Sequence, residues 1–262
     1  MNTPPTIGPP RIFTPEYYAR MRELEQLSWW NAGMRDTAGM LLRTAKLAAK
    51  GTLLDAGCGS GQTMRWFLAD HPAWKATGID VAMDGIVAAR QLGLAVQRAS
   101  VMALPFDASS VDLIITLDVL QHLPLNGGDA TALREFSRVL RPGGTLLVRT
   151  NAQSFPPAAD DHEYSFRKYE PEALREQLEA AGFDILILGR ANALLGLAEI
   201  PRELRARKEQ KSEYHGILAE PRLESRWPRM LKRGWLRLEG RAVTAGWKLP
   251  FGRTIFALCR AR

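Results

Sequence analysis

The stretch Leu53-Leu54-Asp55-Ala56-Gly57-Cys58-Gly59-Ser60-Gly61-Gln62-Thr63 has the pattern of an apolar strand that enters a glycine-rich turn and then a helix. Glycine at every second position allows positive φ angles and lets a ligand approach the backbone more closely than a Cβ would permit. Asp55 ends the strand and places a carboxylate beside the turn. The dinucleotide-binding pattern G-x-G-x-x-G does not apply, because its third glycine, counted from Gly57, would fall on Gln62. The stretch therefore predicts a ligand site of another kind, built on the turn and its acid.

Apolar strands and amphipathic helices alternate after this turn. The near-continuous apolar run 111–117 is typical of a parallel strand that is covered on both faces. The expected strands are 75–79, 94–98, 111–117, 145–148, 183–188 and 254–259, and the expected helices are 62–70, 82–92, 126–140 and 171–181. This alternation predicts an α/β fold.

Gly57-x-Gly59-x-Gly61 behind an acid resembles the first motif of class I S-adenosylmethionine-dependent methyltransferases. Residues 99–106, 118–123 and 138–144 resemble three further motifs of that family, in the right order and at the right spacing. The resemblance covers about residues 52–188 together with the final strand. It implies a Rossmann-like α/β fold, with a seven-stranded, mostly parallel, doubly wound sheet in which only the last strand is antiparallel.

The resemblance also implies that S-adenosylmethionine is the cofactor. Asp80 lies at the tip of the second strand, about 20 residues beyond the glycine turn, where an acid suits two ribose hydroxyls. The alternative is that its carboxylate caps the helix 82–92. Ser100 stands where the family commonly has an acid that meets the adenine amino group. The expected cofactor contacts are Trp30, Arg35, Asp55, Gly57, Cys58, Gly59, Gly61, Asp80, Val81, Ser100, Val101, Met102, Leu117 and Asp118.

Methyl transfer from a sulfonium is an in-line displacement that cancels charge, so alignment in a water-poor pocket supplies much of the acceleration. A base is needed only when the acceptor carries a proton that must leave. His122 follows the tip of the fourth strand, and imidazole titrates near neutral pH. The alternative for His122 is that it packs or caps the turn. His162, beside Asp161 in the loop 151–169, is the competing candidate.

Four regions are expected along the chain: residues 1–50 as an N-terminal arm and helical lid, 51–189 as the Rossmann-like core, 190–252 as a helical insertion, and 253–262 as the final strand of the core. Helices at about 15–30 and 34–49 fit a lid over the cofactor. Their aromatic residues fit packing onto the sheet equally well. Arg35 is a candidate partner for the cofactor carboxylate, or else a solvated residue.

The positive charge is concentrated near the C-terminus. The net charge is +7, and Glu199–Arg262 holds 16 of the 35 basic residues but only 7 of the 28 acidic ones. Within 221–247, apolar residues and arginines both recur at helical spacing. Such a helix could lie on an anionic membrane surface or admit a lipid-like acceptor. The favoured alternative is that its apolar stripe packs on the domain or on a second subunit while the arginines are solvated.

Several classes of protein are disfavoured. No apolar run reaches the roughly 18 residues that cross a bilayer, and no signal-peptide pattern opens the chain, so a cytoplasmic protein is expected. Cys58 and Cys259 offer neither a disulfide framework nor a metal pair. No nucleic-acid substrate is expected. The sequence predicts methyl transfer to an oxygen or nitrogen of a small organic acceptor. A lipid-like acceptor, a non-catalytic cofactor-binding protein and the oligomeric state stay open.

Overall fold

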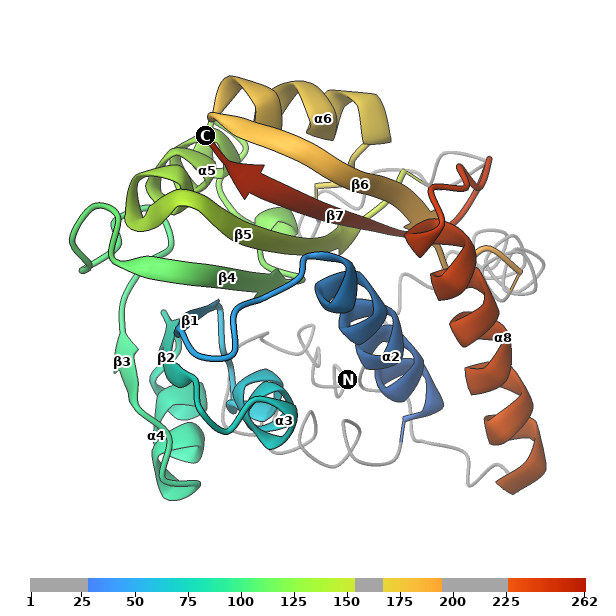
Figure 1. The fold of residues 1–262 in the computed structure, drawn as a ribbon, viewed down its shortest axis with the longest axis horizontal. Helices are drawn as coiled ribbons and strands as arrows, with labels where there is room; N and C mark the ends of the chain where they lie inside the picture. The colour runs from blue at the N-terminus through green and yellow to red at the C-terminus, as the bar shows by residue number, and fades with distance from the viewer. Residues whose placement is uncertain (1–27, 154–166, 195–225) are drawn as a thin grey trace, which may run out of the picture.

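The computed structural model describes residues 28–153, 167–194 and 226–262 (Figure 1). The elements within these residues are, in chain order, α2 (Trp29–Thr44), β1 (Thr52–Ala56), α3 (Gln62–Asp70), β2 (Lys75–Asp80), α4 (Met83–Gln91), β3 (Val96–Arg98), β4 (Val111–Leu117), the 3-10 helix η1 (Leu120–His122), α5 (Gly128–Val139), β5 (Leu140–Asn151), α6 (Pro171–Ala180), β6 (Phe183–Ala191), α8 (Arg226–Thr244) and β7 (Thr254–Ala261). None of the helices in these ranges is long and apolar enough to cross a membrane.

The strands form one seven-stranded sheet in the order β3-β2-β1-β4-β5-β7-β6. The first five strands in this order are parallel to one another. Strand β7 lies between β5 and β6 and is antiparallel to both. The expected seven-stranded, mostly parallel sheet with an antiparallel last strand is therefore confirmed.

Each face of the sheet is covered by helices, as Figure 1 shows. Helices α5 and α6 bury Phe136 and Leu174 on one face, together with Leu146 of β5. On the other face, α2 and α3 bury Met34 and Phe67. Because side chains alternate along a strand, Leu147 of β5 contributes to this second core rather than to the first. The doubly wound arrangement is confirmed.

Helix α2 begins earlier than expected. The Ser28 hydroxyl accepts a hydrogen bond from Asn31 N at 3.2 Å and caps the helix. Trp29 and Trp30 therefore form the first turn of α2, and the expected start of a second helix near Met34 was wrong. The stripe of α2 that includes Met34 is buried against the sheet. Trp29 and Trp30 pack partly buried against the same core, in line with the packing alternative for the aromatic residues. Residues 1–27, which carry most of the expected arm and lid, lie outside the described residues.

Helix α8 packs closely on α2. A Cβ on Gly33 would lie 2.6 Å from Leu236 Cδ1, and one on Gly240 would lie 2.5 Å from Thr37 Oγ1. Glycine at these two positions therefore lets the helices approach. Asp36 of α2 accepts hydrogen bonds from Arg233 of α8 at 2.7 and 3.0 Å. Helix α8 is thus held against α2 by close packing and by an ion pair.

The buried carboxylate of Glu239 ties α8 to the end of β6. It accepts hydrogen bonds from Ala193 N at 3.0 Å and Leu194 N at 3.1 Å. Arg190 and Ala191, which were expected to open the insertion, belong to β6 and pair with β7. The boundary of the insertion therefore lies beyond Ala191, and residues 195–225 lie outside the described residues.

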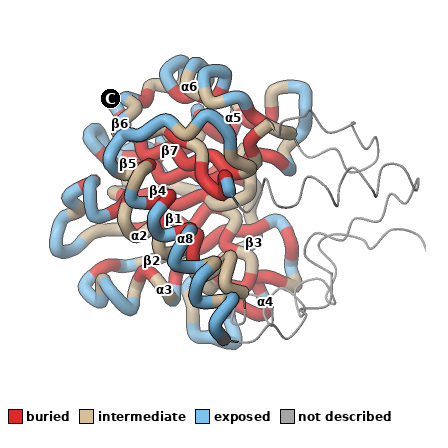
Figure 2. Tube along the Cα trace, turned by 90° about the vertical axis from the view of Figure 1, so that its right-hand side faces the viewer, coloured by how far each residue is buried: buried red, intermediate tan, exposed pale blue. Residues whose placement is uncertain are grey.

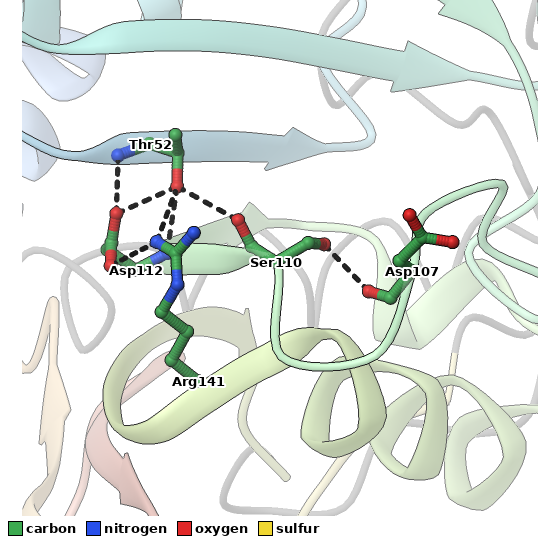
Figure 3. Close-up of polar contacts among 5 residues, drawn as sticks. All are labelled: Thr52, Asp107, Ser110, Asp112 and Arg141. Atoms are coloured by element: carbon green, nitrogen blue, oxygen red, sulfur yellow. Dashed lines mark hydrogen bonds and ion pairs between the residues drawn. The ribbon is translucent and has the colours of Figure 1, made fainter.

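A polar cluster joins the amino ends of β1 and β4 (Figure 3). Asp112 accepts hydrogen bonds from Thr52 N at 2.7 Å and from Thr52 Oγ1 at 2.8 Å. Arg141 contacts its second oxygen. Partial burial raises the pKa of Asp112, but the hydrogen bonds from Arg141 and Thr52 outweigh it and hold the pKa below its ordinary value. The cluster lies at the edge of the sheet opposite the carboxyl ends, so we infer a structural role for it.

Replacing Asp112 with Ala should lower the free energy of unfolding by about 1–3 kcal/mol, because it removes the acceptor of the Thr52 amide. A lowered folded pKa means that the stabilisation is present above the unfolded pKa and is lost as the pH falls through the folded value. The difference between wild type and variant should therefore shrink in acid, as measured by urea denaturation. Asp107→Ala is the control, because Asp107 is exposed and its hydrogen bond from the Ser110 hydroxyl is accepted by the backbone carbonyl, which the substitution keeps. Equal stability of the two variants would contradict the role of Asp112.

Candidate functional site

The carboxyl ends of β1, β2 and β4 meet at one edge of the sheet. The chain leaves β1 towards β2 on one side, whereas β4 pairs with β1 on the other side. This is the point at which the strand order reverses, where ligands of open α/β sheets bind. Asp55, Asp80 and Asp118 lie at or just beyond the ends of these three strands. The structure therefore brings together the three acids that the sequence placed at strand tips.

The glycine turn is shaped by close packing. Gly57 has φ +88°, and a Cβ there would lie 2.2 Å from Val119 Cγ2. The turn after β4 is thus packed directly against the glycine turn. Gly61, at φ +81°, is the N-cap of α3.

The amides of this turn are bonded within the protein. Gly57 N and Cys58 N donate to the Ile79 carbonyl at 2.9 and 2.8 Å, and Gly61 N donates to the Cys58 carbonyl at 2.8 Å. Gly59 N donates to Asp80 Oδ2 at 2.9 Å. The expected cofactor contacts of these four residues stay a prediction. Their contribution is the shape of the turn and the tie from the turn to β2.

Asp80 is buried at the end of β2 and organises the backbone around it. Its second oxygen, Oδ1, accepts a hydrogen bond from Ala82 N at 2.8 Å, at the N-cap of α4. This bond lies just before the first turn of α4 and involves no amide of the helix itself, so the capping alternative stays a prediction. Each carboxylate oxygen accepts more than one hydrogen bond, so these two contacts leave acceptor capacity for ribose hydroxyls.

The glycine turn lies in a negative environment. Burial raises the pKa of the Cys58 thiol, and the carboxylates of Asp55 and Asp80 raise it further. The thiol is therefore neutral at pH 7. The same carboxylates favour a positively charged ligand at this edge.

The segment after β3 is a tight turn. Ser100 Oγ accepts a hydrogen bond from Met102 N at 3.2 Å, and Ala103 N donates to the Ser100 carbonyl at 3.1 Å. Val101 is buried in the core, and Met102 packs against it half-buried. The Ser100 hydroxyl keeps its own proton to donate. Val81, also expected at the site, is 53% exposed just beyond β2.

An ion pair links the ends of β4 and β5. Arg149 Nε donates to Asp118 Oδ1 at 3.0 Å, and its NH2 group contacts Oδ2. The guanidinium also lies over the ring of Trp30, 5.1 Å from its centroid. Asp118 has φ +59°, a backbone conformation that is uncommon for residues other than glycine. Leu117, the last residue of β4, is partly buried against the same core as Trp30.

Arg149 was missed by the sequence analysis. It is buried, and it joins two of the expected site residues, Trp30 and Asp118. An arginine at the carboxyl end of the apolar run 145–148 was the available signal, because a charge there is costly unless it is paired.

His122 ends η1, four residues beyond Asp118. Desolvation by the surrounding protein disfavours the charged imidazole and lowers the pKa of His122 below its ordinary value of 6.5. The Asp118 carboxylate opposes this shift. The ring is therefore neutral at pH 7, which is the form that accepts a proton. His162 and Asp161 lie outside the described residues.

A second buried cluster holds residues 167–169 against the turn after β4. Tyr169 OH donates to Asp129 Oδ2 at 3.2 Å, and Arg167 pairs with the same carboxylate. Arg167 N donates to the Gln121 carbonyl at 3.0 Å. Burial raises the pKa of Tyr169 to about 12, and Arg167 opposes this shift. The sequence showed no signal for this cluster, whose partners come from separate segments.

Arg35 is half-buried on α2. Its expected contact with the cofactor carboxylate stays a prediction, as do the other individual cofactor contacts.

The described residues match the chemistry of S-adenosylmethionine. Asp80 offers a carboxylate for a ribose diol. Val101 and Met102 offer apolar surface, and Ser100 offers a hydroxyl for an adenine. The two acids that raise the pKa of Cys58 suit a sulfonium cation. The fold is Rossmann-like, and the carboxyl edge of its sheet carries residues that suit a nucleoside cofactor.

Comparison with known proteins finds methyltransferases that match part of the chain. Residues 54–148 match the model of a methyltransferase domain. A protein of Mycolicibacterium smegmatis, described as a probable S-adenosylmethionine-dependent methyltransferase, is 34% identical over 148 residues, which are 55% of this chain and 56% of the relative. The ubiquinone/menaquinone biosynthesis C-methyltransferase of Syntrophotalea carbinolica is 33% identical over 126 residues, 44% of this chain and 50% of the relative. Residues 54–148 are thus similar to a methyltransferase domain, and this similarity agrees with S-adenosylmethionine as the cofactor.

The chain spans about half the length of these curated relatives. Among solved structures, that of the [4+2]-cyclase SpnF matches with a TM-score of 0.58 at 22% identity, over 89% of this chain and 83% of the other. At this identity, the match shows the fold alone.

Proposed function

We propose that this chain transfers the methyl group of S-adenosylmethionine to an oxygen or nitrogen atom of a small organic acceptor. One observation carries the proposal. Val119, in the turn between Asp118 and His122, packs directly against Gly57. His122, the candidate base, and the ion pair between Asp118 and Arg149 therefore lie at the same edge of the sheet as the glycine turn. An acceptor held there would face the cofactor.

Some residues of the chain would hold the cofactor, and another would accept a proton from the acceptor. When bound, S-adenosylmethionine supplies an electrophilic methyl group on a sulfonium. Asp80 would hold its ribose, and Val101 and Met102 would hold its adenine. The paired Arg149 would keep the Asp118 carboxylate fixed at the acceptor side. Because displacement at a sulfonium depends mainly on alignment, these holding roles supply much of the acceleration.

His122 would accept the acceptor proton. His122→Gln should lower kcat by about a hundredfold for an acceptor whose proton must leave, the usual contribution of a general base. Because the pKa of His122 is lowered from 6.5, wild-type activity should persist as the pH falls past that value and decline only at lower pH. The variant should lack this acid-side decline, as measured by the pH dependence of kcat.

The control for this experiment is His71→Gln. His71 caps α3 and stacks on Phe67, away from the carboxyl edge of the sheet. It should keep the wild-type pH profile. If His122→Gln keeps the same decline, then His122 only packs or caps its turn.

Product analysis tests the reaction itself. Purified protein with S-adenosylmethionine is offered small alcohols, phenols, amines and carboxylates, and mass spectrometry looks for the gain of one CH₂ group. Methylation of an acceptor by wild type, lost in Asp80→Ala, is the expected result. Binding of the cofactor with no product from any small or lipid acceptor would favour a protein that binds the cofactor without transferring its methyl group.

Two alternatives have specific support. A lipid-like acceptor is favoured by the relative that acts in ubiquinone/menaquinone biosynthesis. The second alternative is a protein that binds the cofactor without methyl transfer, and the same fold occurs in the [4+2]-cyclase SpnF. Lipid acceptors in the same screen separate the first alternative from a small soluble acceptor.

A further inference from the structure

The two sides of α8 have opposite environments. The side towards α2 and β6 buries Leu236, Gly240 and Val243. The opposite side carries large apolar residues that are exposed. Figure 2 shows much of α8 in the exposed colour on the face towards the viewer.

The exposed side of α8 forms one apolar strip. Trp227 is 74% exposed, Leu231 is 72% exposed and Leu238 is 53% exposed. Their spacing of four and seven residues places them on one side of the helix. The favoured expectation was that the apolar stripe of 221–247 packs on the domain or on a second subunit. Packing on the domain is wrong for these residues, because the core contact uses other positions. Trp247, just beyond α8, is also exposed.

Basic residues run alongside this strip. Six of the 19 residues of α8 are arginine or lysine, and its one acidic residue, Glu239, is buried. Arg233, Arg237 and Arg241 follow one another at four-residue spacing and are exposed. Asp36 of α2 contacts the first two of these. The exposed side of α8 thus combines apolar surface with positive charge.

We propose that this side of α8, defined by Trp227, Leu231, Leu238, Arg237 and Arg241, docks on the surface of an anionic lipid bilayer. Leucine and tryptophan would enter the boundary between headgroups and acyl chains, and arginine would contact lipid phosphates. The α2 contacts and Glu239 tie α8 to the sheet, so docking would hold the whole domain at the surface.

Charge complementarity selects this occupant over two others. A second copy of the chain seated with α8 against α8 would bring two strongly basic helices together, and like charges repel. A nucleic acid would use the arginines, but it would leave Leu231 and Leu238 in water, because nucleic-acid sites pair basic residues with stacking aromatic rings. An anionic bilayer satisfies both the apolar strip and the charge.

The test is sedimentation of the full chain with phosphatidylcholine vesicles, with and without phosphatidylglycerol. Wild type should sediment with the anionic vesicles at low salt and be released by high salt, and should not sediment with neutral vesicles. The readout needs neither cofactor nor acceptor, so its failure would leave the proposed methyl transfer untouched.

Two pairs of variants separate the apolar and electrostatic contributions. Leu231→Gln with Leu238→Gln should weaken binding roughly tenfold or more, since both side chains would leave the acyl boundary. Its control is Val87→Gln with Leu92→Gln, which changes exposed apolar residues on or beside α4. Arg237→Gln with Arg241→Gln should weaken binding about thirtyfold, since each basic residue near an anionic surface contributes a factor of about five. Its control is Lys50→Gln with Lys75→Gln, which removes the same charge elsewhere.

Each other outcome would overturn the proposal. Folded wild type that does not sediment with anionic vesicles at low salt removes it. If the control variants weaken vesicle binding equally, then the overall charge or hydrophobicity of the protein is responsible, and not the exposed side of α8. A dimer that only Leu231→Gln with Leu238→Gln dissociates assigns the face to a second copy. Binding to duplex DNA that is tighter than to vesicles, and lost in the same variants, assigns it to nucleic acid.

Discussion

Asp80→Ala should weaken binding of S-adenosylmethionine by about a hundredfold or more. Two hydrogen bonds from ribose hydroxyls to a charged acceptor are lost, at about 1.5–3 kcal/mol each. The variant also removes the acceptor of Gly59 N and Ala82 N, so the glycine turn loses its tie to β2. Isothermal titration calorimetry with the cofactor and with its demethylated product measures the change.

The matched control is Asp84→Ala. Asp84 is an acid in the first turn of α4, four residues beyond Asp80. Its loss should change the affinity little, because a favourable charge near a helix N-terminus contributes only about 0.3–1 kcal/mol to helix stability. Circular dichroism and thermal unfolding check that both variants fold. Folded Asp80→Ala with wild-type affinity would show that the carboxylate only caps α4.

Gly57→Ala should lower the free energy of unfolding by about 2–5 kcal/mol. The left-handed conformation at φ +88° costs an alanine about 1–2 kcal/mol. The new Cβ would lie 2.2 Å from Val119 Cγ2, and relieving such a contact costs about 1–3 kcal/mol. Urea denaturation measures the sum of the two effects.

Two further variants separate the two effects. Gly143 has φ +77°, and a Cβ there would meet nothing within 4 Å, so Gly143→Ala should show the backbone cost alone. Adding Val119→Ala to Gly57→Ala should recover about 1–3 kcal/mol relative to additivity, because it removes the clashing methyl group. If Gly57→Ala costs no more than Gly143→Ala, then Val119 moves aside freely and the close packing of the two turns has little energetic weight.

The strand tips were predictable from the sequence because their signals are local. An apolar run that ends in an acid identifies β1, β2 and β4 without knowledge of the sheet, and Asp55, Asp80 and Asp118 follow directly. The glycine turn was equally legible from its spacing. The internal hydrogen bonds of its amides were not, because Gly57 N and Cys58 N are bonded to Ile79 of a different strand.

Contacts between distant segments could not be predicted. Arg149 meets Asp118 across the sheet and Trp30 from α2, and no spacing in the sequence relates these three residues. The start of α2 was not predicted for a more local reason. The aromatic pair Trp29-Trp30 continues the apolar pattern that precedes it, and this pattern hides the helix cap at Ser28.

Helix α8 shows a different limit of sequence patterns. Leu231 and Leu238 recur at helical spacing, and so do Leu236 and Val243 on the opposite side. Periodicity marks both sides as apolar, but it does not say which one meets the core. Gly240 decides this, because its missing side chain admits Thr37 of α2.

The place of β7 has a consequence for how the chain folds. β7 follows every other described element in the sequence, yet it lies inside the sheet, between β5 and β6. During synthesis β6 emerges first, and it has no hydrogen-bonded neighbour until β7 is available. Long-range pairing is slow, and the edges of β5 and β6 that pair with β7 stay open until β7 has been synthesised. A ribosome paused shortly before Thr254 would therefore expose a nascent chain that is open to aggregation and to chaperones.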